Sequence, residues 1–286
     1  MADLSRRDFL KKTAMTTVGV SAMLAGGGAM AFAEEEKKEL KVRAAVCSPT
    51  GGTMNAAYLL ASMLTEMPEM IDQTSLKSRE NEITFAKDEL AIFAAPSYAG
   101  SIPHAPGLFE NLKGNNTPCV IVTAFGNRAA ENNFAQTHAI ASRNGFVVIG
   151  AIQIVTPHIF GARSGHSRPD VADHEAIREF AESIKAKLAA GNLTAITVEG
   201  NADLGTKYES TIEKKWNAET CVGCGLCASE CPAGAIAANM EINAEACIHC
   251  QRCSHVCPVG ARSYAAAWDG VDSKYLAPRK PVTYIV

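Results

Sequence analysis

Eight of the ten cysteines lie between residues 221 and 257, in two copies of one pattern. Each copy reads Cys-x2-Cys-x2-Cys-x3-Cys-Pro, and the second follows the first at an offset of 26 residues. The flanking residues repeat as well, because Asn217-Ala218-Glu219 recurs as Asn243-Ala244-Glu245. The segment is therefore an internal duplication, and any fold of this chain has to bring two equivalent sets of thiols into equivalent loops.

This cysteine spacing is typical of ligands for [4Fe–4S] clusters. Three cysteines at x2 spacing wrap one loop around three irons, and in two-cluster ferredoxins the fourth cysteine ligates the other cluster. We therefore expect a small α+β, bacterial ferredoxin-like domain that does not fold without its metal. Cluster I would be held by Cys221, Cys224, Cys227 and Cys257, and cluster II by Cys247, Cys250, Cys253 and Cys231.

Two other uses of the cysteines fit this spacing less well. Zinc ribbons use pairs of Cys-x2-Cys rather than this longer run, and a disulfide framework, common in exported proteins, requires no such repeat. His249 and His255 lie inside the second copy, but cysteine already supplies all eight ligands, so we expect both to be surface residues. Cys47 and Cys119 stand apart in apolar runs and are interpreted as core residues.

The first 33 residues have the layout of an export signal. The run Ser5-Arg6-Arg7-Asp8-Phe9-Leu10-Lys11 precedes an apolar stretch and the small residues Ala31 and Ala33. The arginine pair resembles a twin-arginine signal, which would be read by the Tat export machinery and place the protein in the periplasm. A protein that carries iron–sulfur clusters has to fold before export. This fits the twin-arginine route, which carries prefolded proteins. An ordinary secretory signal or an uncleaved anchor are the alternatives, and we favour cleavage, with no stable membrane insertion afterwards.

Residues 40–190 alternate between nearly continuous apolar runs and helical patterns. Such runs indicate strands buried on both faces of a parallel sheet, and the alternation predicts an α/β doubly wound fold. The expected strands are Lys41–Cys47, Leu90–Ala95, Cys119–Thr123 and Phe146–Thr156, with a further short one within 66–75. The expected helices are Met54–Leu64, Ala129–Arg143 and Val171–Ala189.

Three loops follow expected strand ends, where doubly wound sheets bind ligands. The first, residues 48–53, carries hydroxyls and glycines directly before a helix and so predicts a phosphate cradle. The second is Pro96-Ser97-Tyr98-Ala99-Gly100, whose aromatic ring could stack on a flat ligand, and the third is Ala124-Phe125-Gly126-Asn127-Arg128.

The motif Ser48-x-Thr50-Gly51-x-Thr53 after an apolar strand resembles the FMN phosphate loop of flavodoxins. Together with the second and third loops and the cysteine repeat, it makes residues 40–262 similar to flavodoxin–ferredoxin fusion proteins, sometimes called ferrodoxins. The resemblance implies a flavodoxin-like fold that binds FMN, although Gly52 replaces an Asn common in flavodoxins; a scaffold that has lost its flavin is the alternative. It implies these cofactor-binding residues: Ser48, Thr50, Gly51, Gly52, Thr53, Tyr98, Gly100, Gly126 and Asn127.

The expected organisation is a signal (1–33), a flavodoxin-like domain (40–190), a linker (191–215), a ferredoxin domain (216–265) and a tail (266–286) without an assigned role. The net charge of −3, with acids and bases well mixed, argues against a nucleic-acid binder. We interpret the chain as an electron carrier that interacts with redox partner proteins. The alternatives are a flavin- and cluster-dependent reductase, with His158, Arg163 or His166 at its pocket, and an iron–sulfur subunit of a larger exported oxidoreductase.

Overall fold

A central parallel sheet organises the first half of the chain. The computed structural model describes residues 39–286 except 162, 211 and 265–267. The sheet order is β10-β7-β6-β4-β1-β2. Its five parallel strands are β1 (Val42–Val46), β2 (Glu69–Asp72), β4 (Leu90–Pro96), β6 (Thr117–Phe125) and β7 (Phe146–Val155). Counted along the chain, they lie in the order 2-1-3-4-5, which is the order of the flavodoxin-like doubly wound fold.

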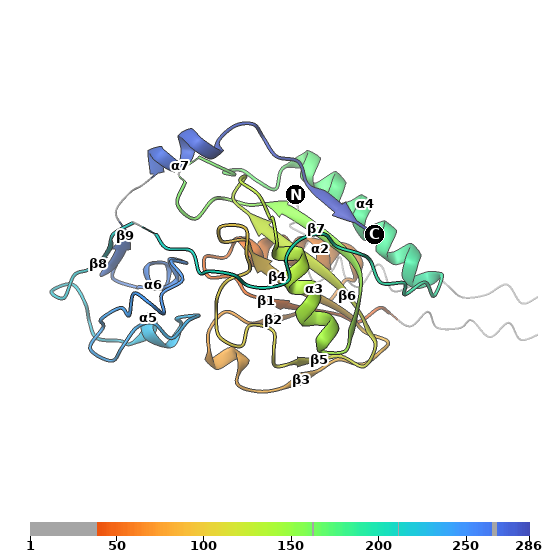
Figure 1. The fold of residues 1–286 in the computed structure, drawn as a ribbon, viewed down its shortest axis with the longest axis horizontal. Coiled ribbons are helices and arrows are strands. Elements are labelled where there is room, and N and C mark those ends of the chain that lie inside the picture. The colour runs from red at the N-terminus through yellow and green to blue at the C-terminus, as the bar shows by residue number, and fades with distance from the viewer. Residues whose placement is uncertain (1–38, 162, 211, 265–267) are drawn as a thin grey trace, which may run out of the picture. The chain divides into compact units, whose positions relative to one another are not determined.

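Helices cover both faces of this sheet (Figure 1). Helices α2 (Gly52–Leu64) and α4 (Val171–Ala189) pack on one face, in a core with Leu60, Ile152 and Phe180. Helix α3 (Asn133–Arg143) lies on the other face, where the core includes Phe93 and Ile121. Every residue of β4 and β6 is buried, as continuous apolar runs require in a sheet covered on both sides.

The expected strands and helices of this domain form near their expected bounds. The clearest difference is α3, which begins at Asn133 rather than Ala129. Residues 129–132 stay outside the helix because Glu131 adopts a positive φ of 46°. Smaller elements complete the domain: the 3-10 helix η1 (Lys77–Arg79) and the strand pair β3 (Ile83–Thr84) and β5 (Leu112–Lys113).

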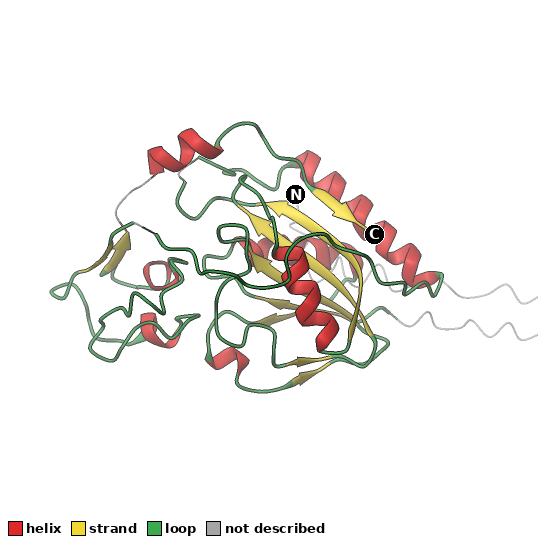
Figure 2. Cartoon of the chain, viewed as in Figure 1, coloured by secondary structure: helices red, strands yellow, loops and turns green. Residues whose placement is uncertain are grey.

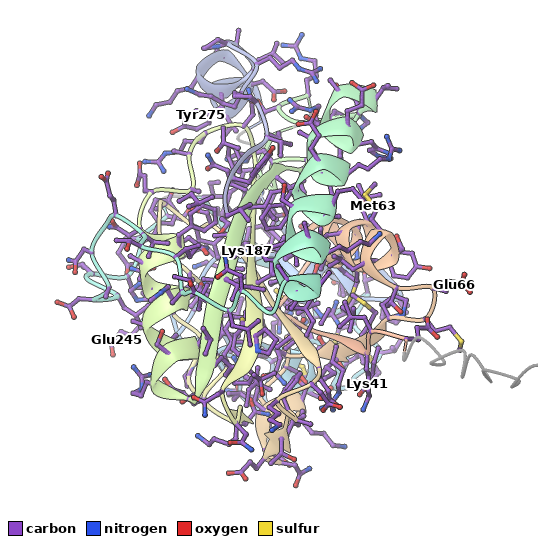
Figure 3. All side chains as sticks on the ribbon, turned by 90° about the vertical axis from the view of Figure 1, so that its right-hand side faces the viewer. Lys41, Met63, Glu66, Lys187, Glu245 and Tyr275 are labelled. Carbon is purple, nitrogen blue, oxygen red and sulfur yellow. The ribbon has the colours of Figure 1, made fainter. Side chains whose placement is uncertain are left out.

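The tail, to which the sequence assigns no role, returns to the sheet. Its helix α7 (Trp268–Tyr275) is followed by β10 (Thr283–Ile285), which pairs antiparallel with β7 and becomes the sheet edge. Two buried polar side chains hold it. Asp272 on α7 accepts hydrogen bonds from the backbone N–H groups of Arg163 and Ser164, and Asn127 bonds the backbone of residues 275–280. Figure 3 shows Tyr275 at the end of α7 and Lys187 on α4, whose ammonium donates to the Ile149 carbonyl on β7.

The tail is also fixed by a charged pair whose strength depends on pH. The Arg279 guanidinium, together with backbone N–H groups at the start of α4, lowers the pKa of Asp170 to about 2. An unfolded Asp titrates near about 3.9, so this contribution is complete above about pH 5 and is lost as the pH falls from about 4 towards 2.

We expect Asp170→Asn, which keeps an N-cap of equal quality, to be less stable than the wild type at neutral pH, with the difference vanishing near pH 2. Urea unfolding midpoints measured across this range test it. A constant difference at every pH would show that the charge of Asp170 is not what stabilises the tail.

The cysteine repeat folds into a small module that is mostly loop (Figure 2). Strands β8 (Lys214–Trp216) and β9 (Arg262–Tyr264) pair antiparallel, and α5 (Leu226–Ser229) and α6 (Arg252–His255) each follow a cysteine loop. An isolated bridge joins Ile236 and Ile242, which are the residues related to Arg262 and Trp216 by the 26-residue offset. The sequence duplication is thus a structural duplication. Among the helices of the described residues, none is long and apolar enough to span a bilayer.

Candidate functional site

The loop after β1 leads directly into α2 and leaves its donors available. Ser48 is buried; its backbone N–H donates to Thr74 Oγ1, and its Oγ accepts from the N–H of Met54. Among the hydrogen bonds of the described residues, none uses the backbone N–H of Thr50, Gly52 or Thr53. Free N–H groups at the start of a 13-residue helix form an anion site. The loop therefore fits the phosphate expected from the sequence.

A pocket of about 390 Å³ opens beside the ends of β4, β6 and β7. This volume lies within the range of small-molecule and cofactor sites. The second and third loops supply one part of its wall, including Tyr98 and Gly126. The rest comes from residues far away in the sequence: Pro157, His158, Ile159, Phe160, Tyr208, Ile212, Ile248, His249, Gly270, Val271, Lys274 and Tyr275.

Tyr98 lies between this pocket and the cysteine module. It lines the pocket and packs against the same buried core that contains Cys47, Cys247 and Cys250. Burial raises the pKa of Tyr98 well above its ordinary value, with further raising by Cys250 and Cys47. Burial also raises the pKa of Cys47 to about 12, so this thiol is a neutral core residue, as the sequence indicates.

Gly126 permits a close approach at the pocket wall. A Cβ at this position would lie 2.4 Å from Cδ2 of His158 and 2.6 Å from its Cα. The His158 ring stacks on Tyr275, with 5.7 Å between ring centroids, so it cannot easily retreat. Gly126 is therefore required for the loops after β6 and β7 to meet, and burial lowers the pKa of His158 between them.

We expect Gly126→Ala to lower the free energy of unfolding by about 1–3 kcal/mol, the usual cost of overpacking a well-filled site. Gly270→Ala is the matched control, because a Cβ there meets nothing within 4 Å. Denaturant unfolding of both variants gives the comparison, and equal stabilities would contradict the close approach.

Two other expected flavin residues have local structural tasks. Gly100 has a φ of 87° and leaves no room for a Cβ beside the Glu131 carboxylate. The Asn127 side chain donates to the carbonyl oxygen of Tyr275 at 2.6 Å and accepts from the N–H of Lys280 at 2.8 Å. Its amide is therefore engaged with the tail, and a contact between Asn127 and a flavin stays a prediction.

The two cysteine loops have matching backbone geometry. Asn217 and Asn243 each accept two backbone hydrogen bonds just before the first cysteine of their copy. The fourth cysteine of each copy accepts from the N–H four residues on, Ala235 to Cys231 Sγ at 3.3 Å and Ala261 to Cys257 Sγ at 3.2 Å. Such N–H···S bonds support the charged sulfur that a cluster requires.

The second copy adopts the same turns without glycine. Gly223 and Gly225 have φ values of 69° and 71°, and their counterparts His249 and Gln251 have 56° and 61°. Left-handed backbone at ordinary residues is strained and persists where the surroundings enforce it. The expectation that His249 is a surface residue is wrong: it is 3% exposed and forms part of the pocket wall, whereas His255 is exposed as expected.

The expected ligands of the two clusters differ in burial. In the set for cluster II, Cys247, Cys250 and Cys253 are buried and Cys231 is partly exposed. In the set for cluster I only Cys227 is buried, while Cys224 is exposed and Cys221 and Cys257 are partly exposed. A hydrogen bond from the Trp216 side chain lowers the pKa of Cys221, while burial raises the pKa of Cys250. Since a buried thiolate needs a counter-charge, ligation to iron is what would keep the second set ionised.

The cysteine side chains are not paired with one another. All ten are free thiols, with no disulfide among them. Across the described ranges of the chain, no three His, Cys, Asp or Glu side chains are gathered closely enough to hold a single metal ion.

The second cysteine loop contacts two loops of the flavodoxin-like domain. The Gln251 amide donates to the carbonyl oxygen of Ile159, and Arg252 Nη1 donates to that of Pro49 in the first loop, at 3.3 Å. Ile248 and His249 complete the pocket wall. The loop 156–169, which contains His158, Arg163 and His166, contributes residues 156–160 to the pocket wall.

Comparison with known proteins identifies a family match for the cysteine repeat. The family model for the 4Fe-4S binding domain matches residues 214–237 and 240–263. A search of the curated proteins finds no match. Solved structures that resemble the chain include a Streptococcus pneumonia TIGR4 flavodoxin (17% identity, TM-score 0.36) and two proteins described as putative flavoproteins, from Bacteroides eggerthii (15%, 0.34) and Bacteroides uniformis (11%, 0.34). Each covers 51% of this chain and 98%, 98% and 99% of its own length, respectively. With such scores, the fold assignment rests on the strand order.

Proposed function

Because the chain joins a flavodoxin-like domain to a ferredoxin-type 4Fe–4S binding domain, we propose that it transfers electrons between FMN and two [4Fe–4S] clusters. The observation that carries the proposal is the shared wall of the pocket. Ile248 and His249, which line it, stand between Cys247 and Cys250, two expected ligands of cluster II. A flavin ring in the pocket would therefore lie next to cluster II rather than cluster I.

The phosphate loop supports FMN as the ligand of this pocket. Its free N–H groups lie at the start of α2. Gly52 on that loop is next to Thr156 in the pocket wall, because a Cβ at position 52 would lie 3.5 Å from the Thr156 side chain. The anion site and the pocket are thus adjacent. One FMN molecule requires this, because its phosphate and its flavin ring have to be bound at the same time. The residues proposed to hold FMN are the nine expected from the sequence. Asn127 is proposed to act indirectly, by holding the tail beside the pocket.

The chemistry of the groups fits a converter of electron number. FMN exchanges two electrons and two protons, whereas each cluster exchanges one electron, so one reduced flavin supplies both clusters. Holding the groups in one chain replaces a bimolecular encounter with a high effective concentration. Cluster I, near the exposed Cys224, is where we expect redox partner proteins to exchange electrons with the chain.

Export by the twin-arginine route belongs to the same proposal. The signal, residues 1–33, lies outside the described residues, and its motif Arg6-Arg7 carries this part of the proposal. Replacing both arginines by lysine should leave the protein in the cytoplasm with its clusters intact. Periplasmic recovery of that variant would contradict the route without affecting the electron-transfer assignment.

Counting cofactors and electrons in anaerobically purified protein tests the function. We expect about eight iron, eight sulfide and one FMN per chain, and about four electrons taken up from dithionite. An uptake of two electrons by protein without flavin would support two clusters and contradict the FMN part of the proposal. Bound zinc, or a colourless protein without iron, would overturn the proposal.

A further inference from the structure

Arg79, the last residue of η1, is a buried arginine with few partners. It is 7% exposed, and its Nη2 donates to the carbonyl oxygen of Pro232. Its Nε and Nη1 have no hydrogen-bond partner, and no carboxylate forms an ion pair with it among the described residues. Burying a charged group without partners is costly. We therefore expect a negatively charged hydrogen-bond acceptor next to Arg79 in the complete protein.

Arg79 lies beside the segment that carries Cys231, the expected ligand that crosses from the first repeat to cluster II. Pro232 directly follows Cys231, whose Sγ accepts from the N–H of Ala235. The residue before η1, Leu76, packs on the same turn, since a Cβ at Gly234 would lie 2.7 Å from its Cδ1. The η1 segment is therefore docked against the chain that delivers Cys231.

We propose that Arg79 is a positioning residue that places a fixed positive charge beside cluster II and raises the reduction potential of that cluster. The inference rests on the proposed function, because it requires cluster II. A cluster gains one negative charge on reduction, so a buried cation stabilises its reduced form more than its oxidised form. The two free N–H groups of Arg79 are also the donors that cluster and thiolate sulfur accept.

The charges around Arg79 agree with this role. Burial lowers its pKa, while Cys47, Asp72 and Cys231 act in the opposite direction. A guanidinium remains protonated even so. Lys77, in the same 3-10 helix, is exposed, so its charge is screened by solvent. The domain that carries the flavin pocket thus contributes a charge to the nearer cluster, which favours electron flow onto it.

The test is an EPR-monitored redox titration of the wild type, Arg79→Met and Arg79→Lys, with Lys77→Met as the matched control. The signal lost in Cys247→Ser identifies cluster II. In Arg79→Met, we expect the reduced-to-oxidised ratio of cluster II at a given potential to fall at least tenfold, a shift of about 59 mV. The reduction potential of cluster I should not change in Arg79→Met. The potential of cluster II should stay close to the wild-type value in Arg79→Lys and equal it in Lys77→Met.

Several results would overturn the inference. These are an unchanged cluster II potential in Arg79→Met, an equal shift of both clusters, or a shift in Lys77→Met as large as in Arg79→Met. If Arg79→Met loses its iron, Arg79→Gln and Arg79→Lys are compared instead, and equal potentials for these two exclude a charge effect. A wild type without cluster II refutes the proposed function itself, which separates that failure from this one.

Discussion

A Cys231→Ser variant is expected to lose the same cluster as Cys247→Ser, although the two residues lie in different copies of the repeat. In both variants the iron content should fall to about half, and the same EPR signal should disappear. The physical reason is the crossing of the fourth ligand. Cys231 packs with the core that contains Cys247 and Cys250, and also with the smaller cluster that contains Cys227 and Cys253. Three of these four cysteines are the other proposed ligands of cluster II, which is why we assign the thiolate of Cys231 to that cluster.

The matched comparison comes from the other set. Cys257→Ser should lose the signal that Cys221→Ser loses, and Cys119→Ser should keep all iron because Cys119 is a buried strand residue. If Cys231→Ser instead resembled Cys221→Ser, each repeat would hold its own cluster, and the assignment of cluster II to the pocket wall would have to be revised.

The parts of the fold that could be predicted are those written in local patterns. Strands β4 and β6 are continuous apolar runs, and α4 has both an apolar stripe and a capping box at Asp170. The cysteine loops are equally local, because the 3- and 4-residue spacings determine where each thiol falls on its turn. Even the left-handed backbone of His249 and Gln251 was available from the sequence, since their counterparts at an offset of 26 are glycines.

The parts that could not be predicted depend on contacts between distant segments. Strand β10 has only three residues, all exposed, and becomes a strand because β7 offers it a free edge. Asn127 looks like a flavin residue within its own loop, and only the return of the tail gives its amide other partners. His249 is polar and directly precedes Cys250, so nothing local indicates that the pocket buries it.

The same distant contacts make the candidate site a joint product of two domains. The flavodoxin-like sheet supplies the phosphate loop and the side of the pocket with Tyr98, while the module supplies Ile248 and His249. A cluster organises its loop by binding the loop's cysteines. We therefore expect the shape of the pocket to depend on the proposed cluster II being in place.

FMN affinity is accordingly expected to fall about tenfold or more when cluster II is removed by Cys247→Ser, and to change less than about twofold when cluster I is removed by Cys221→Ser. Without cluster II, the loop 247–253 loses the restraint that keeps Gln251 on Ile159 and Arg252 on Pro49. Flavin fluorescence titration of the two variants measures the difference.

Linkage supplies the second half of this prediction, because coupling between two binding sites is reciprocal. Bound FMN should slow the loss of iron from cluster II to a chelator while leaving the loss from cluster I unchanged. Gln251→Ala separates coupling from a general loss of folding, since it keeps all eight cysteines and removes one hydrogen bond to the loop after β7. It should weaken FMN binding and expose cluster II to the chelator, with the iron content at purification unchanged. Equal FMN affinity in Cys247→Ser and Cys221→Ser would mean that the pocket is built by the sheet alone, and the path from flavin to cluster II would lose its structural basis.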